Sequence, residues 1–255
     1  MKVATWNVNS LRVRLPHLLA WLAAHAPDIV CLQETKCEDA SFPVAELAAA
    51  GYCSVHHGQR TYNGVAILSR KVAAGVCRGI PEFTDEQSRV IASDVDGVRV
   101  VSVYVPNGQS VGSDKYSYKL RWFEALTTWL EAELAAHPRL IVTGDFNVAP
   151  EDRDVHDPAA WTGQVLFSEA ERAALKCLFA LGFVDAFRLF EQPDKSFSWW
   201  DYRMGAFRRN MGLRIDHMLL SPELAHACKA CSIDVAPRKL ERPSDHAPVV
   251  CELVL

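Results

Sequence analysis

Residues 140–150 read Leu-Ile-Val-Thr-Gly-Asp-Phe-Asn-Val-Ala-Pro, an apolar run that ends in acidic, aromatic and amide side chains. A short apolar run of this kind predicts a buried strand over Leu140–Asp145. Val3–Asn7 and Asp28–Glu34 predict two further strands, the second with apolar residues on both faces of its pleat. All three strands end in a side chain that carries a carboxylate or an amide, so polar groups are expected at the edges of the sheets.

Helical patterns separate the strands in the outer thirds of the chain. Apolar residues at helical spacing predict a helix over Tyr116–Ala136. Ser168, with Glu171 three residues later, predicts a capped helix start, and this helix should run to Leu181. A further helix is predicted to begin at Pro16, because proline suits the first helical position.

Turn signals divide the middle of the chain into short strands. Within Tyr52–Val105, the dipeptides Asn63-Gly64 and Asp96-Gly97 are typical of tight hairpins, so this part should be antiparallel. Two later strands are predicted over Ile215–Leu220 and Ala247–Leu255. The mixed strand order predicts an α/β fold, a four-layer α/β sandwich with two packed mixed β-sheets flanked by helices.

Size and composition suit a single domain over residues 1–255. The chain is 49% apolar and 23% charged, which is typical of a soluble globular protein and argues against disorder. Its net charge of −4 lacks the basic character of a protein that coats nucleic acid. That balance is still compatible with an enzyme whose site holds carboxylates and a metal ion.

The cysteines and the N-terminus bear on location. Eight cysteines, several of them inside apolar runs, are expected to be reduced thiols. Cys228 and Cys231 form a C-x-x-C pair, but without a second pair or suitably spaced histidines a buried structural role is favoured over a metal or redox role. No signal peptide or long apolar span is apparent, so a cytoplasmic protein with no membrane association is expected.

Polar side chains stand at the ends of five predicted strands. Asn7, Glu34 and Asp145 end three of them, whereas Asp216 and Asp245 lie near the starts of two later ones. Acidic residues beside strands often only begin turns. If the later strands run antiparallel to the earlier ones, however, all five residues share one rim.

Carboxylates gathered at one rim repel each other unless a cation or a shared proton relieves them. Oxygen ligands without a cysteine or histidine cluster favour a hard ion such as Mg²⁺, which also accepts phosphate oxygens from a substrate. His246 follows Asp245, and a histidine held by a carboxylate such as Asp216 favours its charged form, which can donate to a phosphoryl oxygen. The sequence therefore predicts metal-assisted chemistry on a phosphate ester.

Eight sequence blocks follow one another in order at residues 5–9, 32–36, 63–69, 104–107, 144–150, 197–203, 212–216 and 243–248. Together they resemble, nearly end to end, the exonuclease III and apurinic/apyrimidinic (AP) endonuclease branch of the endonuclease/exonuclease/phosphatase superfamily. Single elements of these blocks, namely Glu34, Asp145 with Asn147, and Ser244-Asp245-His246, are shared with phosphoinositide phosphatases and sphingomyelinases. The full blocks at 32–36 and 197–203 resemble those of the DNA-repair branch.

The resemblance implies roles for individual residues. The implied metal ligands are Glu34, Asn7, Asn9, Asp145, Asn147, Asp245 and His246. The implied catalytic residues are Tyr104, Asp145, Asn147, Asp216 and His246. The implied substrate-binding residues are Asn7, Trp199, Leu213, Ile215 and Arg203, with core packing as the competing interpretation for Ile215. Asn9 replaces an Asp of many relatives, His217 has no implied role, and the general base is left open between Asp145 and Tyr104.

The resemblance also implies an activity. It predicts hydrolysis of DNA 5′ to abasic sites to leave a 3′-hydroxyl, with 3′→5′ exonuclease and 3′-phosphatase activity. Mg²⁺ is the implied cofactor, Mn²⁺ should substitute for it, and double-stranded DNA with abasic sites or blocked 3′ ends is the implied partner of a monomeric enzyme. Three alternatives stay open. The first is a 3′-phosphatase and exonuclease specialist with weak abasic-site incision, in which a loop residue such as His156 tunes the 3′ pocket. The other two are a lipid phosphodiesterase and a catalytically silent nucleic-acid binder.

Overall fold

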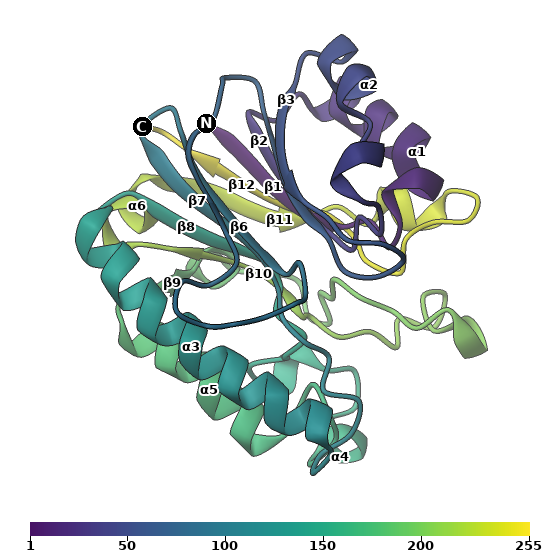
Figure 1. Cartoon of the computed structure of the whole chain (residues 1–255). Coiled ribbons are helices and arrows are strands. Elements are labelled where there is room, and N and C mark those ends of the chain that lie inside the picture. Colours follow the sequence, from purple (N-terminus) through teal and green to yellow (C-terminus); the bar gives the residue numbers. More distant parts are fainter.

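A computed structural model describes the whole chain, residues 1–255, as two six-stranded sheets packed face to face with helices outside them (Figure 1). The first sheet has the order β11-β12-β1-β2-β4-β3, and the second has the order β5-β6-β7-β8-β10-β9. Both sheets contain parallel and antiparallel pairs, so the predicted sandwich of two mixed sheets is confirmed.

The strands of the first sheet are β1 (Lys2–Asn7), β2 (Ile29–Gln33), β3 (Cys53–His57), β4 (Val65–Ser69), β11 (Cys228–Ile233) and β12 (Val249–Leu253). Those of the second are β5 (Ala74–Arg78), β6 (Val90–Val95), β7 (Val98–Tyr104), β8 (Leu140–Asp145), β9 (Val184–Asp185) and β10 (Asp216–Leu220). The α-helices are α1 (Leu11–His25), α2 (Val44–Ala49), α3 (Asp114–Ala136), α4 (Pro158–Trp161), α5 (Glu169–Ala180) and α6 (Pro222–Ala227). Short 3₁₀ turns lie at Asp39–Ser41, Asp152–Asp154, Ala186–Leu189, Arg203–Gly205 and Ala236–Lys239.

Apolar residues on both faces of the central strands create three packed layers. Val3 of β1 faces the layer between the two sheets, together with Val100 of β7, whereas its neighbour Ala4 faces the layer under α1 and α2. Helices α3 and α5 cover the outer face of the second sheet, and Leu126 and Leu175 lie in that third layer (Figure 1). The helices therefore bury the faces that the sheets cannot bury against each other.

Two helix predictions are confirmed, and one is wrong. Helix α3 covers the predicted segment, and Ser168 caps α5 in a capping box with Glu171. Helix α1, however, begins at Leu11 and encloses Pro16, which had been predicted as its first residue. The helix begins earlier because the N–H groups of Ser10 and Leu11 donate to the carbonyls that follow β2, a tertiary tether that proline chemistry does not reveal.

The two predicted tight turns differ. Asp96 and Gly97, both with positive φ, form the two-residue turn between β6 and β7 as expected. Asn63 and Gly64 instead end a longer connection, residues 58–64, between β3 and β4. Their carbonyls accept the N–H groups of the two residues after Glu34, so this turn supports the end of β2. None of the helices combines the length and hydropathy that a bilayer crossing requires.

Candidate active site

The polar strand ends meet at one rim of the sandwich, as the direction of the strands requires. Strands β1 and β2 are parallel, and β10 runs antiparallel to β8 with Asp216 paired in register with Asp145. The buried Asn7 amide joins the two sheets, because its Nδ2 donates to Glu34 Oε1 and to Asp145 Oδ2, both at 2.9 Å. The expected convergence is therefore observed.

His246 lies at the centre of this rim and is buried. Its Nδ1 is 2.9 Å from Asp216 Oδ2, and its Nε2 is 3.8 Å from Asp145 Oδ2. Burial alone lowers the pKa of His246, but the negative charges of Asp216 and Asp145 outweigh it and raise the pKa to about 10. Ser198 Oγ donates to Asp216 at 2.6 Å and fixes the carboxylate that orients the imidazole. The imidazole is therefore cationic at neutral pH.

Asp145 is a buried carboxylate, and its surroundings favour the uncharged form. Burial raises its pKa to about 7, an effect that His246 opposes and Asp216 reinforces. The backbone N–H of Asn147 donates to Asp145 Oδ1 at 2.9 Å. A carboxyl group with this pKa can accept a proton near neutral pH, which suits general-base chemistry.

The amide of Asn147 and the phenol of Tyr104 lie next to these carboxylates. Asn147 adopts a left-handed backbone conformation (φ 50°), its Nδ2 donates to the Val105 carbonyl at 2.9 Å, and its Oδ1 accepts from Asn107 Nδ2 at 3.3 Å. Burial, followed by the negative charge of Glu34, raises the pKa of the Tyr104 phenol well above its ordinary value. The phenol is therefore neutral at neutral pH.

Asp245 and Asn9 form a second part of the rim. Asn9 Nδ2 donates to Asp245 Oδ1 at 2.8 Å, and Trp199 Nε1 donates to Asp245 Oδ2 at 3.0 Å. Burial alone raises the pKa of Asp245, but the charge of His246 and these two donors outweigh it and lower the pKa. Lys36 Nζ bridges Asn9 Oδ1 at 2.6 Å and Glu34 Oε2 at 2.8 Å, so it neutralises part of the acidic charge.

The chemistry of the donors fits a divalent cation. Glu34, Asp145 and His246 each offer a ligand atom, and these atoms lie within 4.8 Å of one another. Two carboxylates suit a hard ion. The imidazole suits one less well, because a cationic His246 has no free lone pair to donate to a metal.

The predicted apolar wall is only partly accessible. Trp199 and Leu213 pair through two backbone hydrogen bonds of 2.9 Å, which places the Trp199 side chain beside Asp245. Leu213 and Ile215 are 0% and 1% exposed and pack in a small apolar cluster. Arg203 lies outside this cluster, with its exposed guanidinium paired to Asp201.

Sequence reasoning assigned no role to three residues that contact the site. Lys36, Asn107 and Ser198 each lie in a sequence block that the resemblance rests on. Asn107 and Ser198 bond partners 40 and 18 residues away, and Lys36 joins the neighbouring Glu34 to Asn9, 27 residues away. Nothing in their local pattern distinguishes them from ordinary surface or turn residues. Position within the blocks was the one signal available.

Comparison with known proteins places this geometry in a family. Residues 4–246 match the Endonuclease/Exonuclease/phosphatase family. An exodeoxyribonuclease III from Haemophilus influenzae is 36% identical over 99% of both chains. The Neisseria protein NExo, described as a 3′-5′ exonuclease and, in a complex with a product DNA hairpin, as a 3′ phosphatase, is 46–47% identical with a TM-score of 0.98 over 100% of both chains.

An AP endonuclease from Archaeoglobus fulgidus has a similar structure, with 40% identity and a TM-score of 0.96 over 100% of both chains. These matches cover the rim and both sheets. They confirm the resemblance that the sequence blocks indicated. The chain belongs to the endonuclease/exonuclease/phosphatase family, within its exodeoxyribonuclease III and AP endonuclease branch.

Proposed function

We propose that this protein is a DNA-repair nuclease that hydrolyses the phosphodiester 5′ to an abasic site and leaves a 3′-hydroxyl, with 3′→5′ exonuclease and 3′-phosphatase activity. The observation that carries the proposal is the His246–Asp216 pair facing Asp145, with Glu34 at the same rim. The relatives named as exodeoxyribonuclease III, AP endonuclease and 3′ phosphatase support it.

The reaction we propose is an in-line attack of water on phosphorus, in which the new P–O bond forms as the bond to the 3′ oxygen breaks, and the leaving 3′ oxygen takes a proton from solvent water to become the 3′-hydroxyl. Asp145 accepts the proton of the attacking water, because its pKa of about 7 lets it act as a base near neutral pH. His246 stays protonated and donates to a non-bridging phosphoryl oxygen, where it offsets the charge that develops. Asn147 and Tyr104 orient the phosphate, and the raised pKa of Tyr104 favours Asp145 over it as the base.

We propose Mg²⁺ as the cofactor, with Mn²⁺ able to replace it. Glu34 and Asp145 would hold it most directly, with Asn7 next to both. When bound, the ion supplies positive charge to the phosphoryl oxygens and lowers the barrier to attack. The sequence also implied Asn9, Asn147, Asp245 and His246 as ligands, but a protonated His246 cannot coordinate the ion, so we propose it as a donor to the phosphate instead.

The proposed partner is double-stranded DNA with an abasic site or a blocked 3′ end. Trp199 would receive the base-free sugar, which leaves the helix easily because it has no stacking or pairing to lose. For Leu213 and Ile215 to contact that sugar, their side chains must first be uncovered. Arg203, which is exposed, would contact a phosphate of the backbone. We further propose one domain and a monomer.

The test compares two DNA duplexes, one with a tetrahydrofuran abasic analogue and one with a 3′-phosphate, in Mg²⁺ and in EDTA. Both should be processed in Mg²⁺ to a 3′-hydroxyl end, and neither in EDTA. Asp216→Asn should slow both reactions about 100-fold or more, because His246 loses its orienting charge. Full activity in EDTA, or an Asp216→Asn enzyme as fast as wild type, would contradict the proposal.

A second candidate is a 3′-phosphatase and exonuclease specialist with weak abasic-site incision. The observation that favours it is the similarity to NExo, a 3′ phosphatase, which exceeds the similarity to the archaeal AP endonuclease. His156, whose Nδ1 is 3.3 Å from the Gly212 carbonyl, is the loop residue proposed to tune the 3′ pocket. The ratio of the two rates in the same assay separates the candidates.

A further inference from the structure

We propose that Lys119 and His217 are positioning residues. They hold the loop of residues 147–150 so that the Asn147 side chain points toward the site. Neither residue reaches the rim, and His217 had no role in the sequence. The inference rests on the role proposed for Asn147, and its test separates the two.

Lys119 on α3 is fully buried and contacts two segments that flank the site. Its Nζ donates to the Asn147 carbonyl at 2.7 Å and to the Asn107 carbonyl at 3.1 Å. The side chains of Asn107 and Asn147 also bond each other at 3.3 Å. The Lys119 ammonium group therefore hydrogen-bonds both of the segments that carry these amide side chains. Glu171 completes the set as the counter-ion, 2.5 Å from Nζ.

His217 on β10 holds the next carbonyl of the same loop. Its Nε2 is 2.8 Å from the Val148 carbonyl, which can only accept, so Nε2 must carry the proton. Its Nδ1 is 3.1 Å from Nη1 of Arg214, which can only donate, so Nδ1 must be free of a proton. The two partners thus fix the neutral tautomer and the plane of the ring.

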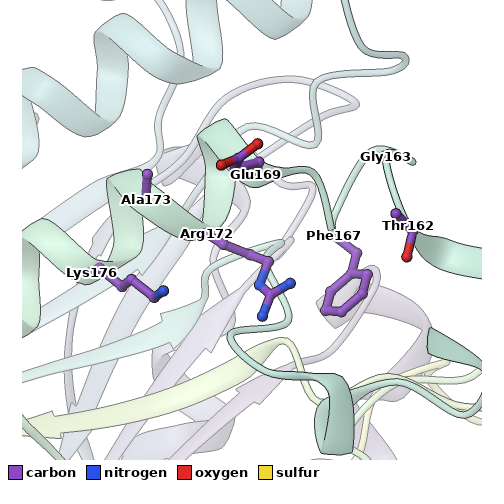
Figure 2. A pocket seen from close by; sticks show the side chains of 7 residues that line it. All are labelled: Thr162, Gly163, Phe167, Glu169, Arg172, Ala173 and Lys176. Atoms are coloured by element: carbon purple, nitrogen blue, oxygen red, sulfur yellow. The ribbon is translucent and has the colours of Figure 1, made fainter. Parts of the chain in front are cut away.

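A third donor holds the far end of the loop. Arg172 leaves α5 beside the ring of Phe167, at a surface hollow of about 490 Å³ (Figure 2). Its Nε donates to the Pro150 carbonyl at 2.9 Å. Three side chains from three elements therefore hold three of the four carbonyls of residues 147–150. These bonds hold the loop in which Asn147 has its left-handed conformation, one that asparagine adopts more readily than most residues.

Burying the charged side chain of a lysine in a protein core costs free energy. Burial lowers the pKa of Lys119, and Glu171 only partly compensates. An apolar residue of similar volume often packs as well as a buried ion pair. The presence of Lys119 at this buried position is explained if its hydrogen bonds set the geometry of Asn147. A small displacement of a group that orients the substrate lowers the reaction rate strongly.

The test is a double-mutant cycle on the turnover of a 3′-phosphate duplex in Mg²⁺. Lys119→Met is made in the wild-type and in the Asn147→Ala backgrounds, and Lys229→Met, an exposed lysine on edge strand β11, is the matched control. We expect Lys119→Met to lower kcat about 10-fold or more in the wild type, with KM changed less than about two-fold. In the Asn147→Ala background its effect should fall below about two-fold, because the group it positions is gone.

Circular dichroism and thermal unfolding report whether each variant is folded. If Lys119→Met does not fold, His217→Leu takes its place in the cycle, with the same expectation. Equal losses in both backgrounds, or wild-type kcat in a folded Lys119→Met enzyme, would overturn this inference while leaving the role of Asn147 intact. Wild-type turnover of Asn147→Ala itself would overturn both.

Discussion

Replacing Asp145 with asparagine should remove a pH dependence of folding stability that the buried Asp145 carboxylate imposes on the wild type. The side chain is 1% exposed, and its pKa rises from 3.8 to about 7 in the folded protein. Folding therefore favours the protonated form. The penalty is absent below pH 3.8, grows as pH rises, and is complete above a pH of about 7.

The size of the effect follows from the two pKa values. A rise from 3.8 to about 7 corresponds to at most about 4 kcal/mol in the free energy of unfolding. Because His246 shares this charge interaction, we expect roughly half of that, about 2 kcal/mol. The wild type should thus lose about 2 kcal/mol relative to Asp145→Asn between about pH 4 and about pH 8.

The assay is urea unfolding in EDTA, followed by tryptophan fluorescence at several pH values. Asp154→Asn is the matched control, because its carboxylate is also buried but pairs with Arg214, which lowers its pKa below the ordinary value. For Asp154 the stabilisation is lost only as pH falls, so the difference between wild type and this variant should be flat from about pH 5 to about pH 8. A wild type that gains on Asp145→Asn as pH rises, or a flat difference, would refute the reasoning.

Three further outcomes follow from the same geometry. In Mg²⁺, kcat should rise with pH as Asp145 loses its proton, through a pKa of at most about 7. It should fall again near a pKa of about 10, where His246 loses its proton. A pH–rate profile checks both limbs, and a fall in kcat that begins below neutral pH would contradict the prediction. Ser198→Ala removes the donor to Asp216 and should lower kcat about 10-fold, measured on the abasic duplex, whereas an unchanged kcat would show that the carboxylate needs no such support. Trp199→Ala should weaken binding of abasic DNA about 10-fold or more with little loss of thermal stability, and a large fall in the melting temperature would instead assign the ring to core packing.

Local pattern predicted most of the elements correctly, because hydrophobic period and end signals act over a few residues. The Ser168–Glu171 capping box and the Asp96-Gly97 turn are complete within four residues, and both formed as expected. Pro16 shows the limit of this reasoning. The start of α1 is set by hydrogen bonds to the residues after β2, which no pattern near Pro16 reports.

The candidate site shows the same division. The sequence itself determined that carboxylates and amides stand at strand ends, and its ordered blocks determined the family. Only the tertiary structure decided that Asn7 bridges the two sheets and that Lys119 hydrogen-bonds the backbone of both Asn107 and Asn147. It also decided that Leu213 is buried. The reason is physical: a strand end is a local property of the chain, whereas Asn7 and Lys119 bond partners 138 and 28 residues away, which come within reach only once the chain has folded.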